Sequence, residues 1–334
     1  MKNDDYQASN TPLGVRDYPP ESTAEFYTLQ GQLLQTFEQS RYQRVMTPVF
    51  ELAQVFERGL SPLESSRLLR FTDPQTGDAL VLRSDITPQI ARLVCGALAD
   101  APLPLRLCYF GRVFRLRQHT EFQRREVAQA GVELVGDPSA SADIEVIKLC
   151  DRALRAAKVS DYVLSLGHVG VLAAALEQVP PEILRTVRDL LRKKDTAGLE
   201  HCLSDVPGET RELLLDVTTW HGTPQDVFNR ARPWSERNHA VKSALKHLGA
   251  LLEGLGDTAD RCLIDLGQML GFGYYTGLVF HAWAPGAGTA IASGGRYDNL
   301  IARYGRDLSS VGFAIDEEGI TAVRSRPSSG TIRS

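Results

Sequence analysis

The first hydrophobic pattern in the chain has the period of a helix, and the second has that of a strand. After Pro20, apolar residues recur every three or four positions and predict an amphipathic helix. These residues are Phe26, Leu29, Leu33 and Phe37. The β-branched, alternating segment at residues 44–52 then predicts a strand that contains Pro48. Because proline lacks a backbone N–H, this strand belongs at a sheet edge or bulge, where another subunit can pair.

Strands and helices then follow in mixed order. Residues 79–83 predict a strand, and a helix is expected to begin at Pro88. Residues 105–136 predict two strands joined by a polar connection of roughly eight residues, and another helix follows from Asp143. A long hairpin between helices favours an antiparallel sheet over doubly wound βαβ units. The predicted fold class is therefore α+β.

The strand pattern fades in the middle of the chain and later returns. Helical periods dominate residues 166–257, which predicts a helical insertion. Residues 1–165 and 258–325 are then expected to form one domain that continues after the insertion. The polar residues 326–334 predict a disordered tail.

Composition excludes several classes of protein. Of 334 residues, 43% are hydrophobic and 23% charged, as in ordinary globular chains and unlike disordered or collagen-like ones. A net charge of −4 argues against coating nucleic acid by bulk charge. The N-terminus is polar and acidic, and the longest apolar stretch is too short to cross a membrane. We therefore expect a cytoplasmic protein without membrane contact.

Cysteine and histidine spacing points away from metal chemistry. The five cysteines form no CxxC pair and predict reduced thiols. The seven histidines lack metal-ligand spacing, and no GxSxG nucleophile motif is present. We therefore expect no catalytic residue, no metal and no cofactor.

Polar residues on the predicted hairpin point to a pocket. Six arginines fall within residues 105–125: Arg106, Arg112, Arg115, Arg117, Arg124 and Arg125. Strand alternation places Gln129 and Glu133 on one face, and an ordinary register puts Arg115 opposite Gln129. Gly131, on the same face, leaves space for a ligand. The alternative is a solvated face on which the arginines pair with carboxylates.

A second polar segment lies near the end of the chain. Residues 267–280 and 293–298 combine glycines with Tyr274 and Tyr275, which is compatible with a small-molecule pocket or with plain turns. The glycine spacing does not match GxGxxG, so the sequence argues against a dinucleotide fold.

Taken together and in chain order, several segments resemble the catalytic domain of histidyl-tRNA synthetases. These segments are RVMTPVFE, LRSDIT, FRLR with REVAQAGVELVG, GYYTGLVF, ASGGRYDNL and VGFAID. The resemblance covers nearly the whole chain. It implies a class II aminoacyl-tRNA synthetase-like antiparallel sheet flanked by helices, with a helical insertion and a dimer formed through the proline-bearing first motif.

The resemblance also implies a site for histidine. The residues that it assigns to this site are Asp85, Thr87, Arg115, Gln129, Glu133, Tyr274 and Tyr275. Asp85 and Thr87 resemble the residues that hold the amino group, with Gln129 assisting. Glu133 and Tyr274 resemble the imidazole contacts, which suits an imidazole whose two nitrogens need partners.

Departures from the synthetase pattern fall on residues that the resemblance assigns to activating histidine and to binding ATP. Leu270 stands where the synthetases have an arginine before the paired tyrosines, and Arg117 replaces a glutamate. Asp316 and Gly319 occupy the glycine and arginine positions of the third motif, whereas Arg115 of the second motif is retained. Since losing one transition-state donor costs about 10²- to 10³-fold in rate, adenylation should be negligible.

The chain also ends shortly after the third motif, so we expect no anticodon-binding domain and no tRNA. Such a chain resembles the regulatory subunit of ATP phosphoribosyltransferase. The resemblance implies a non-catalytic dimer that joins a short catalytic subunit in a hetero-oligomer for the first step of histidine biosynthesis, with L-histidine as its feedback ligand. Two alternatives stay open: a truncated histidyl-tRNA synthetase, and a stand-alone histidine sensor or tRNA-binding paralogue.

Overall fold

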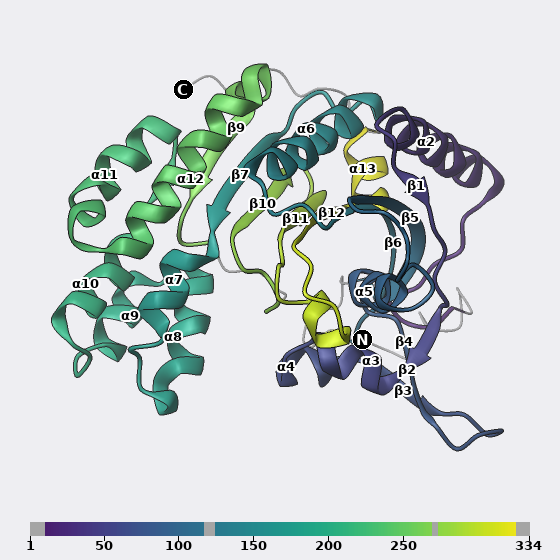
Figure 1. Ribbon diagram of the computed structural model, residues 1–334, viewed down its shortest axis with the longest axis horizontal. Coiled ribbons are helices and arrows are strands. Elements are labelled where there is room, and N and C mark those ends of the chain that lie inside the picture. Colours follow the sequence, from purple (N-terminus) through teal and green to yellow (C-terminus); the bar gives the residue numbers. More distant parts are fainter. Residues whose placement is uncertain (1–10, 117–123, 269–272, 325–334) are drawn as a thin grey trace, which may run out of the picture.

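A curved nine-stranded sheet organises the chain (Figure 1), for which a computed structural model describes residues 11–116, 124–268 and 273–324. The strand order is β1-β5-β6-β12-β11-β10-β7-β9-β8. The strands are β1 (Gln43–Arg44), β5 (Leu105–Phe114), β6 (Glu126–Val135), β7 (Val163–His168), β8 (His221–Gly222), β9 (Cys262–Asp265), β10 (Leu278–Trp283), β11 (Ala292–Arg296) and β12 (Ser310–Asp316). The pairs β1–β5 and β7–β9 are parallel, and the other described pairs are antiparallel. The predicted α+β class is confirmed.

Helices cover one face of this sheet and form the larger core. They are α2 (Pro20–Gln39), α6 (Ala140–Ala156), α12 (His239–Leu255) and α13 (Glu317–Arg324). The apolar stripe of α2 is buried as its spacing predicts, and Phe37 packs against Phe313 of β12 with ring centroids 6.1 Å apart. Alternate residues of β6, among them Val132 and Leu134, belong to the same core. Burial of such apolar side chains is the main stabilising contribution.

The opposite face carries smaller elements and a second core. The helices on this side are α3 (Ala53–Gly59), α4 (Pro62–Ser65), α5 (Thr87–Cys95) and the 3₁₀ helix η2 (Ile301–Tyr304). A three-stranded sheet in the order β2-β4-β3 accompanies them, with β2 (Phe50–Leu52), β3 (Leu69–Thr72) and β4 (Ala79–Leu82). Ile90 and Val94 of α5 pack with Leu107 of β5 and Leu300. This packing fixes α5 against the sheet, so that its first residue, Thr87, lines a cavity together with residues of β6, β11 and β12.

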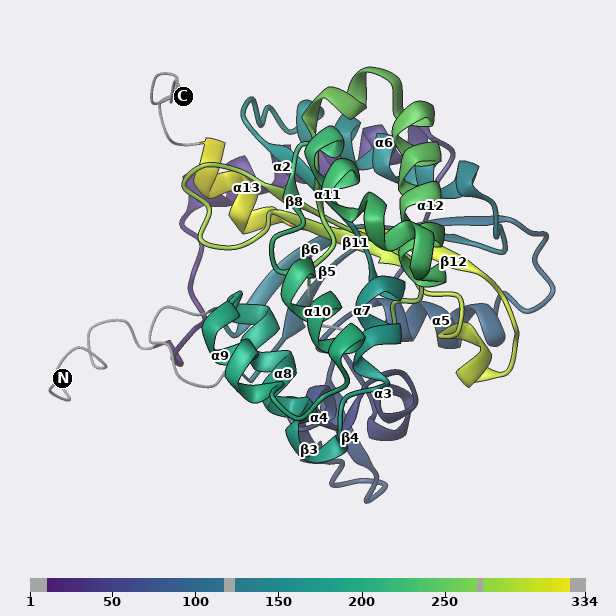
Figure 2. The same ribbon diagram turned by 90° about the vertical axis from the view of Figure 1, so that its left-hand side faces the viewer.

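Between β7 and β9 the chain is mainly helical. It forms α7 (Val169–Leu176), α8 (Pro181–Lys193), α9 (Thr196–Cys202), α10 (Gly208–Val217), α11 (Pro224–Arg237) and α12, followed by the 3₁₀ helix η1 (Gly256–Arg261). Figure 2 shows α7 to α10 grouped together. The division of the chain into a domain, an insertion and a tail stays a prediction. Residues 325–334 lie outside the described part of the chain.

The single strand predicted for residues 44–52 is wrong. The chain leaves the large sheet after β1 and enters the small sheet at β2. Side chains satisfy the carbonyls in between: Arg83 donates to Thr47 O at 2.9 Å, and Gln89 donates to Pro48 O at 2.9 Å. Because proline cannot donate to a ladder, Pro48 lies in the connection between the two sheets.

The predicted hairpin register is also wrong. Gly111, and not Arg115, lies opposite Gln129. Arg115 follows the end of β5, and its backbone N–H donates to Arg125 O at 2.8 Å. The connection between the two strands, residues 115–125, is longer than the roughly eight residues expected, and Arg115 belongs to it and not to β5.

Two further expectations concern the state of the cysteines and the presence of a membrane-spanning helix. All five cysteines are free thiols, and Cys108, Cys150 and Cys262 are buried. No helix in the described ranges combines the length and the apolar character that a membrane span requires.

A buried ion pair joins the helical layer to the sheet. Asp143 of α6 accepts from Nη2 of Arg296 of β11 at 2.8 Å, and the two side chains are 1% and 7% exposed. His247 Nε2 of α12 lies 3.0 Å from the other carboxylate oxygen of Asp143. Arg296 also donates to the carbonyls of Asp137 and Ser139. The pair is therefore part of a hydrogen-bonded network that spans three elements.

We predict that Asp143→Ala lowers the free energy of unfolding by about 3 kcal/mol, because it removes the buried carboxylate of Arg296 and leaves only the partly exposed Asp298 beside this buried charge. Urea denaturation measures this loss. The control is Glu57→Ala, which breaks the exposed pair of Glu57 with Arg70 and should cost less than about 1 kcal/mol. Equal losses in the two variants would contradict a special role for the buried pair.

Candidate functional site

A cavity of about 560 Å³ lies on the face of the sheet that carries α5. All seven residues predicted for a histidine site line it: Asp85, Thr87, Arg115, Gln129, Glu133, Tyr274 and Tyr275. They come from the segment before α5, its first turn, the β5–β6 hairpin and the segment before β10. The structure thus brings together residues that are far apart in the sequence, and their binding of histidine stays a prediction.

Glu133 is the most enclosed acid in the cavity. Its side chain is buried on β6, and it accepts from Thr87 Oγ1 at 2.7 Å, from Tyr109 OH at 3.5 Å and from Tyr297 OH. Gly312 of β12 lies directly opposite. A Cβ at Gly312 would overlap Glu133 Oε2, so only glycine leaves room for this carboxyl group.

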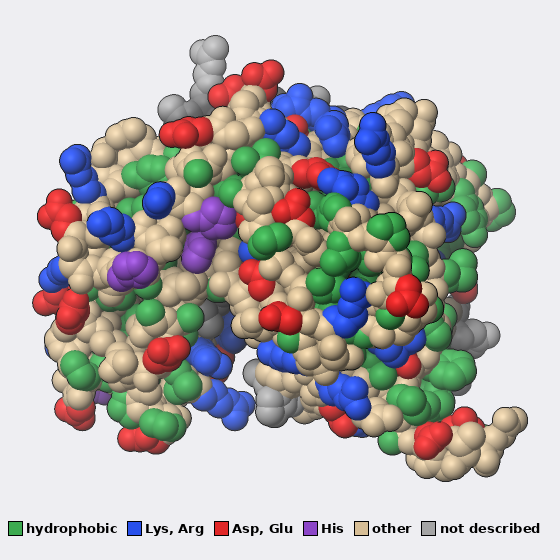
Figure 3. Space-filling model, in the orientation of Figure 1, with side chains coloured by type: hydrophobic (Ala, Val, Ile, Leu, Met, Phe, Trp, Pro, Cys, Tyr) green, Lys and Arg blue, Asp and Glu red, His purple; other side chains and the backbone are tan. Residues whose placement is uncertain are grey.

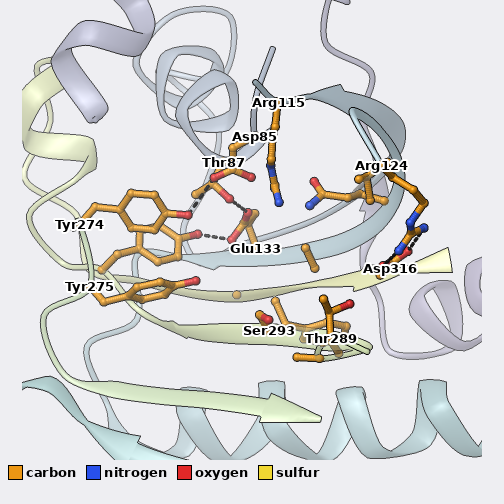
Figure 4. Close-up of a pocket in the computed structure, with 18 of the residues that line it drawn as sticks. Asp85, Thr87, Arg115, Arg124, Glu133, Tyr274, Tyr275, Thr289, Ser293 and Asp316 are labelled. Carbon is orange, nitrogen blue, oxygen red and sulfur yellow. Dashed lines mark hydrogen bonds and ion pairs between the residues drawn. The ribbon is translucent and has the colours of Figure 1, made fainter. Parts of the chain in front are cut away.

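Asp85 and Tyr274 form a second buried pair (Figure 4). Tyr274 OH donates to Asp85 Oδ2 at 2.8 Å. The other oxygen of Asp85 accepts from the backbone N–H of Ile86 at 2.8 Å. The ring of Tyr274 lies 4.8 Å from that of Tyr275 and 5.7 Å from that of Tyr297, measured between centroids. Packed rings hold these hydroxyl groups in fixed positions.

Burial changes the protonation of these groups. It raises the pKa of Glu133 to about 8, although the hydroxyl groups of Tyr297 and Thr87 oppose this rise. Burial, followed by the nearby carboxylates, raises the pKa of Tyr274 and of Tyr297 well above the ordinary value. Both phenols therefore remain hydrogen-bond donors, and Glu133 holds a proton over much of the neutral range.

Gln129 and Arg115 add an acceptor and a cation to the cavity wall. Gln129 is 7% exposed, and within the described ranges its Oε1 has no hydrogen-bond partner. Arg115 donates from Nε to Ser84 O at 2.9 Å, and its guanidinium group extends beside Asp85. A buried acceptor without a partner is costly, so Oε1 of Gln129 calls for an N–H donor from a ligand.

Two tyrosines of the site were missed from the sequence. Tyr109 lies opposite Gly131 on β5, and a Cβ at Gly131 would overlap its ring. The space predicted at Gly131 for a ligand is therefore filled by Tyr109. Tyr297 lies within residues 293–298, but no local pattern in the sequence indicates that its hydroxyl group reaches Glu133.

Three of the described arginines of the hairpin region pair with carboxylates. Arg106 pairs with Glu145 at 2.7 Å, and Arg112 pairs with Glu126 at 3.3 Å. Arg124 binds Asp316 and Glu318 at the end of the cavity away from Tyr274 and Tyr275. Two residues on which the resemblance departed from the synthetases, Arg117 and Leu270, lie outside the described part of the chain.

Comparisons with known proteins agree on one family. A family model described as histidyl-tRNA synthetase matches residues 14–320. An ATP phosphoribosyltransferase regulatory subunit of Moorella thermoacetica is 39% identical over 95% of this chain and 83% of its own. A protein of the same name from Anaeromyxobacter dehalogenans is 38% identical, and the match covers 94% of this chain and 91% of that protein.

Solved structures show the same fold. A Bacillus halodurans protein described as an ATP phosphoribosyltransferase regulatory subunit/histidyl-tRNA synthetase superposes with a TM-score of 0.83, 30% identity, and coverage of 95% of this chain and 83% of that one. A histidine–tRNA ligase subunit from Alicyclobacillus acidocaldarius superposes with a TM-score of 0.80 and 29% identity. The match covers 94% of this chain and 96% of that one. The predicted class II synthetase-like fold is confirmed.

We predict that Glu133 makes stability fall as pH rises. Its pKa is about 8 in the folded protein against an ordinary 4.5, so the folded state binds this proton more tightly than the unfolded state does. The contribution of Glu133 to the free energy of unfolding is complete below its unfolded pKa of 4.5 and is lost as pH rises through its folded pKa of about 8. Between these values the free energy of unfolding falls by up to about 1.4 kcal/mol per pH unit.

Urea unfolding of the unaltered protein and of Glu133→Gln, from about pH 5 to about pH 8, isolates this effect. The difference in the free energy of unfolding between the two proteins should shrink as pH increases. A difference that stays constant over this range would mean that Glu133 is ionised throughout.

Proposed function

The chain belongs to the ATP phosphoribosyltransferase regulatory subunits within the histidyl-tRNA synthetase family, and we propose that it activates a separate, short catalytic subunit by assembly. In this proposal the catalytic subunit carries out the first step of histidine biosynthesis. L-histidine, the end product, binds in the cavity of this chain and changes the activity of the assembly. The observation that carries the proposal is the convergence of all seven predicted site residues on one cavity.

The chemistry of the cavity supports a zwitterionic amino acid with a polar ring. Asp85 and Oε1 of Gln129, which has no hydrogen-bond partner in the described part of the chain, are acceptors for an ammonium group. Arg115 is a donor for a carboxylate. Glu133 and Tyr274 can bind the two nitrogens of an imidazole. A site of buried polar groups rejects ligands that leave them unpaired, and this favours histidine over apolar amino acids.

We propose that the chain forms no adenylate and binds no tRNA. The proposal needs no metal or cofactor. Asp316 stands at a position of the third motif where the resemblance expects glycine, and Arg124 is bound to two carboxylates. A truncated synthetase, the competing function, would instead exchange pyrophosphate in a histidine-dependent reaction, and robust exchange would reject the regulatory role.

We predict that the purified chain, mixed with a short ATP phosphoribosyltransferase catalytic subunit from the same cell, raises its turnover and makes it respond to histidine. A coupling of about 1 to 3 kcal/mol would change affinity by roughly 5- to 150-fold. Steady-state turnover with and without histidine measures the effect. If the two proteins neither associate nor change each other's activity, a stand-alone sensor becomes the better proposal.

The same assay tests the site with matched variants. Asp85→Asn should keep activation but reduce the response to histidine, because it removes the charge that faces the ammonium group. Asp189→Asn is the control, since Asp189 pairs with Arg192 on the exposed surface of α8. A full response to histidine in Asp85→Asn would move the ligand to another site.

An apolar patch supports self-association through the first motif. Met46, Val49, Phe50 and Phe71 are 83%, 47%, 55% and 43% exposed, and the rings of Phe50 and Phe71 are 6.2 Å apart. Figure 3 shows hydrophobic side chains over the region of the three-stranded sheet. Exposed apolar side chains grouped in this way are typical of protein–protein interfaces, and we propose a second copy of this chain as the partner.

We predict that Phe50→Asp converts a dimer of this chain to a monomer, because it places a charge in the apolar interface. Light scattering coupled to size-exclusion chromatography measures the mass. Leu263→Asp is the control, since Leu263 is an exposed apolar residue at the far end of the sheet, on β9. A dimer that persists in Phe50→Asp, or a monomeric unaltered chain, would contradict this interface.

A further inference from the structure

The end of the cavity away from the tyrosines contains an internal carboxylate held by two partners. Asp316 directly precedes α13, and its Oδ1 accepts from the backbone N–H of Gly319 at 2.9 Å. The same oxygen accepts from Arg124 Nη1 at 2.9 Å, and Oδ2 accepts from Nη2. Figure 4 shows this pair at the edge of the cavity. Both Arg124 and Asp316 line the cavity.

These partners are the groups that bind anions in proteins. The first turn of a helix presents unpaired N–H groups and a positive dipole end, and arginine binds carboxylate or phosphate through two parallel N–H bonds. Here the side chain of Asp316 fills that position from within the chain. Glu318, only 4% exposed, binds Nη1 of the same arginine, so two carboxylates surround Arg124.

A neighbouring side chain indicates what the cavity accepts instead. Gln129 lies directly opposite Asp316 across the β6–β12 pair. It is 93% buried, and its Oε1 lacks a hydrogen-bond partner among the described residues. This atom requires a donor, whereas a phosphate offers acceptors. The cavity wall beside Asp316 is therefore set for a ligand with N–H groups.

We propose that Asp316 acts as a built-in anion that excludes phosphorylated ligands from the cavity and leaves it selective for a free amino acid. The exclusion has two parts: Asp316 occupies the N–H group of Gly319 and the guanidinium of Arg124, which a phosphate would use, and it repels a second anion. This inference rests on the proposed function, since it concerns the selectivity of the same cavity.

A purely structural role for Asp316, as the cap of α13, makes a different prediction. Asparagine caps helices about as well as aspartate, so Asp316→Asn keeps the bond to Gly319 and removes the charge. A structural role leaves ligand selection unchanged in this variant. The proposed role changes it.

The test is isothermal titration calorimetry of the full chain with inorganic pyrophosphate and, separately, with L-histidine. We expect no measurable pyrophosphate binding to the unaltered chain and detectable binding to Asp316→Asn. The double variant, Asp316→Asn with Glu318→Gln, should bind pyrophosphate at least about tenfold more tightly than the single variant, because each change removes one negative charge near the site. Adding Arg124→Gln to the double variant should abolish the binding.

The control is Glu126→Gln, which removes one carboxylate from Arg112 on the same hairpin and should not create pyrophosphate binding. Pyrophosphate binding by the unaltered chain, or its absence from folded Asp316→Asn and double variants, would overturn the proposal. Circular dichroism establishes folding. Failure of every protein to bind histidine would count against the proposed function alone, because the pyrophosphate comparison does not depend on it.

Discussion

A carboxyl group enclosed in the sheet, that of Glu133, sets the geometry of the cavity. Removing such a group from water is costly unless hydrogen bonds replace the lost solvation. Thr87, Tyr109 and Tyr297 provide these bonds from three different elements. Gly312 leaves the space in which the carboxyl group lies. The positions of α5, β5, β6, β11 and β12 relative to one another are therefore tied to one side chain.

The same strands connect this site to the other face of the sheet. Tyr297, which binds Glu133, directly follows Arg296, which binds the buried Asp143 of α6. Asp143 in turn contacts His247 of α12. Polar contacts on both faces thus meet at the last residue of β11 and the residue that follows it. A shift of β11 would disturb the two networks together, which gives the cavity a physical link to the helical layer.

Local patterns in the sequence predicted local features well. The spacing of apolar residues predicted α2, and alternation placed Gln129 and Glu133 on one face of β6. The register of the hairpin was missed because alternation along one strand does not determine which residue of the partner strand lies opposite. The break at Pro48 was missed because a distant side chain, that of Gln89, satisfies its carbonyl. Tyr109 and Tyr297 were missed for a related reason: their hydroxyl groups meet Glu133 only in the folded chain. The grouping of all seven site residues came from the family resemblance and not from periodicity.

A cavity of this kind can serve regulation without chemistry. An enzyme gains rate only from contacts that are stronger in the transition state than in the ground state, whereas a sensor needs contacts that differ between two arrangements of the protein. A ligand held between Asp85 before α5, Glu133 on β6 and Tyr274 before β10 touches three separately positioned segments. It therefore binds more tightly to any arrangement that brings these segments together. This difference in affinity is enough to shift an assembly, with no nucleotide and no bond formed.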